Sequence, residues 1–194
     1  MKALVKLATS NKGKATEFAK MFHEHGLELE IAYLKTIEIQ SDSLENIAAY
    51  SSLQAFNTLN EPVFVEDAGL FINSLNGFPG PYSSFAYKTI GIDGVLRLVE
   101  GHDRTVVFKS VIALYAPDYG VVLFKGECKG RLASFPRGEN GFGFDPIFIP
   151  DEGDGRTFAE METDEKNRLS HRGKATRRLI KWLKEKDVAL THSD

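Results

Sequence analysis

The stretch KALVKLATSNKGKATEFAKMF, residues 2–22, decides the fold class of this 194-residue chain. Its apolar start, 2–8, predicts a short buried strand. The run breaks at Thr9-Ser10-Asn11, residue types that favour turns and helix caps. Beyond the break, one buried helix face is predicted by apolar residues spaced three and four apart, at Ala15, Phe18, Ala19 and Phe22. A strand that leads through a capped loop into a helix is a typical opening of an α/β domain.

The rest of the chain continues with strand and helix signals. Further strands are predicted at 29–33 and 63–66, and further helices at 44–59 (capped by Asp42 and Ser43), 92–99 and 170–186. Two β-rich runs, 105–116 and 121–132, flank the turn sequence Pro117-Asp118-Tyr119-Gly120, which predicts an antiparallel hairpin. The expected architecture is a single α/β domain with mixed strand directions.

Composition narrows the class of protein. Hydrophobic residues make up 42% and charged residues 26% of the chain, which is typical of a globular domain. The net charge of −3 argues against a nucleic-acid-binding surface. No apolar run is long enough to span a membrane, and the first residues lack the apolar segment of a signal peptide. The only cysteine, Cys128, allows no intrachain disulfide. We therefore expect a cytoplasmic protein that binds neither nucleic acid nor membrane.

The break after the first strand is a candidate phosphate site. A helix start offers unsatisfied backbone N–H groups and the positive end of the helix dipole. Lysines add positive charge, and a glycine lets the backbone approach an anion closely. The candidate residues are Thr9, Ser10, Asn11, Lys12, Gly13 and Lys14. The Walker A pattern is absent, and an ordinary helix cap with two solvated lysines is the alternative.

Carboxylates follow the strand predicted at 63–66. Glu66 and Asp67 stand at its end, and Glu38 lies between apolar neighbours earlier in the chain. Strand ends in α/β sheets are common positions for sites, and carboxylates there can bind Mg²⁺ or accept a proton from water. Solvated turn charges are the alternative.

Two later segments contain groups suited to a nucleotide. In 137–146, glycines alternate with aromatic residues that can stack on a base, and a carboxylate follows; the candidates are Phe142, Gly143, Phe144 and Asp145. In 165–173, cationic donors precede the last helix; the candidates are Lys166, His171 and Arg172. The alternatives are a glycine-rich turn with two core phenylalanines and a solvated basic cap. No residue spacing indicates a zinc site or a serine-hydrolase elbow.

Four segments in this order resemble the inosine triphosphate pyrophosphatase family, and its archaeal branch most closely. They are TSNKGK (9–14), VEDAGLFINSLNGFPGPYSS (65–84), GENGFGFDPIF (138–148) and TFAEMETDEKNRLSHRGKA (157–175). The resemblance implies one domain over residues 1–194, an elongated two-lobed mixed β-sheet flanked by helices, with the active site in the cleft between the lobes. It also implies a homodimer that hydrolyses abnormal purine nucleoside triphosphates (ITP, dITP and XTP) to the monophosphate and pyrophosphate.

The resemblance also implies roles for individual residues. The loop at Thr9–Lys14 is expected to hold the triphosphate. Asp67 is expected to bind Mg²⁺ and to accept the proton of the attacking water, with Glu38 as a second metal ligand. The nucleotide is expected to be surrounded by Phe142 to Asp145, Lys166, His171 and Arg172. Ala68 stands where many members have Ser or Thr, so only a backbone contact is expected there.

The expected selectivity follows from the purine six-position. A keto oxygen accepts hydrogen bonds from His171 or Arg172, whereas the amino group of adenine presents donors to donors. Phe144 is the expected stacking partner of the purine. Competing hypotheses are a Maf-like pyrophosphatase, which the GFGFDP and SHR sequences argue against, and a nucleotide-binding protein without catalysis, which the Glu66-Asp67 pair argues against. Nucleic-acid binding is a third and weaker alternative.

Overall fold

The computed structural model describes residues 5–186, which divide into two compact units. Unit 1 comprises the described residues up to Asp67, Val111–Lys125 and those from Ala175 onward; unit 2 comprises Ala68–Ser110 and Gly126–Lys174. The strands of the described chain form a mixed sheet in the order β2-β1-β3-β5-β6-β7, with β4 beside β3. Three strands supply residues to both units: β3 (Val63–Ile72), β5 (Thr105–Ala116) and β6 (Gly120–Leu132).

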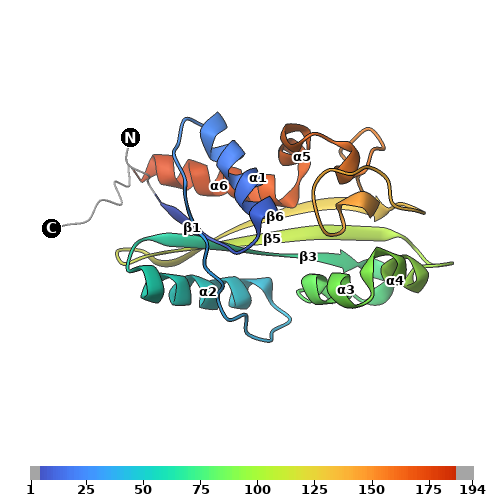
Figure 1. The fold of residues 1–194 in the computed structure, drawn as a ribbon, viewed down its shortest axis with the longest axis horizontal. Helices are drawn as coiled ribbons and strands as arrows, with labels where there is room; N and C mark the ends of the chain where they lie inside the picture. Colours follow the sequence, from blue (N-terminus) through green and yellow to red (C-terminus); the bar gives the residue numbers. More distant parts are fainter. Residues whose placement is uncertain (1–4, 187–194) are drawn as a thin grey trace. The chain divides into compact units, whose positions relative to one another are not determined.

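Unit 1 carries helices on both faces of its part of the sheet. Its own elements are β1 (Lys6–Ala8), α1 (Lys12–Glu24), β2 (Glu30–Ala32) and α2 (Leu44–Leu59), with most of α6 (His171–Glu185). In Figure 1, α1 and α6 lie on one face and α2 on the other. Phe18 and Phe22 of α1 pack on Phe64 of β3, with ring centroids 5.3 and 5.8 Å apart. The helix predicted from this periodicity is therefore confirmed, although Ala19 is exposed and Met21 is buried instead.

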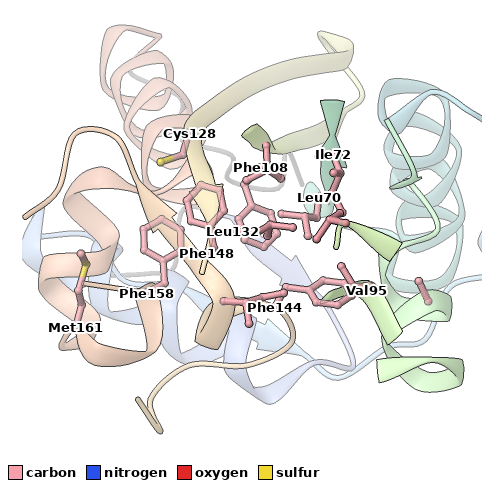
Figure 2. Packing of buried hydrophobic residues seen from close by; sticks show 14 residues of the cluster. Leu70, Ile72, Val95, Phe108, Cys128, Leu132, Phe144, Phe148, Phe158 and Met161 are labelled. Carbon is pink, nitrogen blue, oxygen red and sulfur yellow. The ribbon is translucent and has the colours of Figure 1, made fainter. Parts of the chain in front are cut away.

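Unit 2 is built on a separate hydrophobic cluster, shown in Figure 2. Its shorter elements are η1 (Asn73–Leu75), β4 (Pro79–Gly80), α3 (Ser83–Thr89), α4 (Gly91–Leu98), η2 (Asp145–Ile147), β7 (Phe148–Pro150), η3 (Phe158–Glu160) and α5 (Thr163–Leu169). Phe108 of β5 contacts Phe148 and stacks near Phe158. Cys128 is fully buried in the same cluster, and burial raises the pKa of its thiol to about 12, so it is no activated nucleophile.

Several element boundaries differ from those expected. Strand β3 continues past 66 to Ile72, because pairing of Leu70 and Phe71 with β4 extends it beyond the carboxylates and glycine that end the apolar run. Helix α3 has no predicted counterpart, and neither does α5, a mostly polar segment whose start is fixed by a capping box between Glu162 and Glu165.

The β5–β6 hairpin is confirmed: the strands are neighbours joined by a three-residue turn. Residues 2–4 of the first predicted strand lie outside the described residues. Within 5–186, no helix is long and apolar enough to cross a membrane.

Candidate active site

Three parallel strands of unit 1 bring the segments with the predicted carboxylates and the phosphate loop to the same end of the sheet. Strand β1 pairs in parallel with β2 on one side and with β3 on the other. The carboxyl ends of parallel neighbours face the same way, which is where α/β sheets form their sites. The loop 9–11 and the segment 33–43 that carries Glu38 follow the carboxyl ends of β1 and β2, and the Glu66-Asp67 pair lies within β3, just past the level where β1 ends.

The loop after β1 has the geometry of a capped helix start. Asn11 Oδ1 accepts from the backbone N–H of Lys14 at 3.1 Å, and Thr9 Oγ1 accepts from the N–H of Asn11 at 3.1 Å. The N–H groups of Lys12 and Gly13 belong to the same first turn, where intrahelical bonds do not satisfy donors. Together with the exposed Lys12 side chain and the helix dipole, they suit an anion such as phosphate.

Lys14 lies in a partly buried ion pair, and the alternative of a solvated lysine is wrong for this residue. Its Nζ is 2.7 Å from the carboxylate of Glu66 and donates to the backbone carbonyl of the same residue at 2.9 Å. The Glu66 side chain is fully buried. Lys14 thus fixes strand β3 at Glu66, the residue before Asp67. Because the Glu66 carboxylate is engaged by Lys14, the partly exposed Asp67 is the better candidate for accepting a proton from water.

The carboxylates in these segments offer the type of ligand atom that Mg²⁺ prefers. Glu38 and Asp67 offer hard carboxylate oxygens, and Glu38 is exposed. Among residues 5–186, no three His, Cys, Asp or Glu side chains are grouped to hold a metal by themselves. Mg²⁺ is usually bound by one or two carboxylates together with substrate phosphates and water rather than by a complete protein cage. Asp67 and Glu38 are therefore the candidate carboxylate ligands, and the helix start at Lys12 is the candidate phosphate site.

A second group of predicted residues gathers within unit 2 around Phe142. The Lys166 ammonium lies 4.8 Å from the centroid of this ring, and the Arg172 guanidinium lies 5.4 Å from it. Lys166 and Arg172 are each 2% exposed, so the alternative of a solvated basic cap is wrong for them. Cations over an aromatic face are held by its negative electrostatic potential.

Asp145 fastens the loop that carries Phe142. Its Oδ2 accepts from the backbone N–H of Phe142 at 2.8 Å and from Lys166 Nζ at 2.6 Å, and both charged side chains are almost fully buried. A Cβ at Gly141, whose φ is +73°, would collide with this carboxylate. Oδ2 therefore already serves the loop and Lys166, and the expected place of Asp145 beside the nucleotide stays a prediction.

The two phenylalanines of this loop have different surroundings. Phe144 is 3% exposed, belongs to the hydrophobic cluster in Figure 2 and meets Tyr87 edge-on at 5.5 Å. As packed, it offers no open face, so the expectation that Phe144 stacks on a purine is wrong for this conformation. Phe142 is partly exposed and is the candidate stacking residue instead. Gly143, between them, has a φ of +63°, which a glycine adopts without strain.

His171 and Arg172 occupy the first turn of α6. Ser170 caps this turn by accepting from the N–H of Gly173 at 3.0 Å. The His171 ring stacks on Phe108, with centroids 4.5 Å apart and planes at 9°. Phe158 stacks near His171 and lies 5.7 Å from Lys166 Nζ. The sequence does not predict that Phe108 and Phe158 position His171. The only sequence signal for these two residues is the apolar pattern of their segments.

Known proteins match this arrangement over most of the chain. The model of the Ham1 family matches residues 5–182. A dITP/XTP pyrophosphatase of Hyperthermus butylicus is 52% identical, covering 94% of this chain and 95% of that protein; one of Methanopyrus kandleri is 50% identical, covering 93% and 96%. The solved structure of a HAM1 protein from Coxiella burnetii has a TM-score of 0.80 and 32% identity, covering 93% of this chain and 98% of that one. Sequence, fold and four motifs therefore agree, and the chain belongs to the Ham1 family.

Proposed function

We propose that this chain is a nucleoside-triphosphate pyrophosphatase that hydrolyses dITP, XTP and ITP to the nucleoside monophosphate and pyrophosphate. The observation that carries the proposal is identity of 50–52% over more than nine tenths of the chain with two proteins named dITP/XTP pyrophosphatase. The cations and carboxylates that follow β1 and β2, together with the carboxylates of β3 beside the end of β1, support the same reaction.

Unit 1 provides the groups for the chemistry. The N–H groups of Lys12 and Gly13 and the Lys12 ammonium bind the phosphates. Asp67 accepts the proton of the water that attacks the α-phosphorus, and pyrophosphate is the leaving group. Asp67 and Glu38 would hold Mg²⁺, which neutralises phosphate charge when bound. Lys14 and Glu66 keep the backbone before Asp67 in place through their partly buried ion pair.

Unit 2 provides the groups for base recognition. Phe142 stacks on the purine, and stacking of this kind contributes on the order of 1–3 kcal/mol per base. His171 and Arg172 donate to the six-keto oxygen of hypoxanthine or xanthine.

We further propose that the enzyme acts as a homodimer in the cytoplasm, as the family resemblance implies.

The product distinguishes this reaction from other triphosphate hydrolysis. With Mg²⁺, ITP is expected to yield IMP and pyrophosphate in equal amounts, because attack at the α-phosphorus expels both terminal phosphates together. Anion-exchange chromatography with a pyrophosphate assay checks this, and ATP is the comparison substrate. IDP with free phosphate would contradict the mechanism, and binding of ITP without any product would favour the non-catalytic nucleotide-binding protein.

Selectivity is expected to depend on Arg172. Arg172→Ala removes a donor to the keto oxygen and leaves Asp67 in place, so ITP should lose on the order of 1–3 kcal/mol of transition-state binding and ATP much less. Phe142→Ala should weaken both nucleotides by similar factors, because every purine has a π-face. The ratio of kcat/KM for ITP and ATP measures the effect, with the exposed Arg168→Ala as control. An unchanged ratio in both Arg172→Ala and His171→Ala would mean that these residues bind phosphate instead.

A further inference from the structure

The segment that carries Glu38 is held by a side chain from α2. Residues 33–43 form neither helix nor strand. Gln54 of α2 binds both backbone polar groups of one residue in this segment. Its Oε1 accepts from the backbone N–H of Ile37 at 3.2 Å, and its Nε2 donates to the carbonyl of Ile37 at 2.7 Å. The primary amide therefore pairs with Ile37 as a neighbouring strand would, immediately before Glu38.

This contact can position Glu38 because the residue before it is not held by apolar packing. The Ile37 side chain is 74% exposed, so apolar packing does not fix the segment there. Helix α2, in contrast, is anchored by its buried face, which includes Ala48 and Ala55, and Ser43 caps it by accepting from the N–H of Asn46. Gln54 therefore connects an anchored helix to the peptide next to Glu38.

We propose that Gln54 is a positioning residue that fixes Glu38 for binding the divalent cation, an inference that rests on the proposed function. The role requires a donor and an acceptor on one side chain.

Gln54→Glu keeps the shape but at neutral pH loses the donor and presents a carboxylate oxygen to the Ile37 carbonyl. Gln54→Met keeps the length and loses both hydrogen bonds. Asn57→Ala, which removes an exposed amide from the same helix, is the matched control.

Cation binding tests the role by two measurements. In Gln54→Met and Gln54→Glu, the Mg²⁺ concentration for half-maximal ITP turnover should rise roughly 10-fold, the lower end of the loss typical for residues that orient metal ligands. The kcat at saturating Mg²⁺ should return near the parent value, and Asn57→Ala should match the parent throughout. Binding of Mn²⁺ to the nucleotide complex, followed by electron paramagnetic resonance, should weaken by a similar factor without any turnover being required.

A Glu38→Gln background separates positioning from a general loss of structure. If Gln54 acts through the Glu38 carboxylate, Gln54→Met should weaken Mn²⁺ binding much less in Glu38→Gln than in the parent. Equal weakening in both backgrounds, or weakening no greater than in Asn57→Ala, would overturn the proposal. Failure of the parent to release pyrophosphate from ITP would overturn the proposed function instead, and the Mn²⁺ measurement would still decide the role of Gln54.

Discussion

Asp67→Asn is expected to lower ITP turnover by roughly 10²-fold or more, the contribution typical of a general base. The substitution keeps the side-chain shape and removes the charge that accepts the proton and binds Mg²⁺. Nucleotide binding should persist, because the helix start at Lys12 and the group around Phe142 are unchanged. Steady-state kinetics with ITP and equilibrium binding of ITP in Ca²⁺ measure the two effects separately.

Glu66→Gln is the informative comparison for this result. The Glu66 side chain is fully buried and paired with Lys14, so its substitution should act on the stability of unit 1 and on the position of Asp67. If Asp67→Asn retains near-normal turnover, the proton acceptor is another carboxylate, and Glu66 or Glu38 would be the residue to examine.

Lys166→Met is expected to destabilise the fold by about 3–5 kcal/mol, the range for breaking a buried ion pair at one partner. The Lys166 and Asp145 side chains are only 3% and 4% exposed, so the Asp145 carboxylate would lose the positive charge 2.6 Å away in a site that water barely reaches. Equilibrium unfolding in urea, which is independent of catalysis, measures the change.

A surface pair of the same length is the control for Lys166. Lys174 and Glu152 are also 2.6 Å apart, but Glu152 is 58% exposed. Lys174→Met should therefore cost less than about 1 kcal/mol. The double variant Asp145→Asn/Lys166→Met should recover part of the loss, because it also removes the buried negative charge that Lys166 offsets. Equal destabilisation by Lys166→Met and Lys174→Met would contradict a special structural role for the buried pair.

The local parts of the fold could be predicted from the sequence because their causes lie within a few residues. Asn11 caps α1 through the N–H group three residues later, as its position after an apolar run indicates. The β5–β6 hairpin follows from a turn sequence between two β-rich runs. The family membership was also predictable, since it depends on the order and spacing of four motifs.

The tertiary structure decided which of several chemically equal residues takes each role. Sequence reasoning chose Phe144 over Phe142 for stacking, but the hydrophobic cluster of unit 2 buries Phe144 and leaves Phe142 partly exposed. Likewise, Lys14 and Lys12 are equivalent in sequence until Glu66, 52 positions away, engages one of them. Burial and ion pairing depend on which distant segments the sheet brings together. Local residue pattern therefore determined most of the elements, whereas packing between them set the extent of β3 and assigned the roles of the side chains.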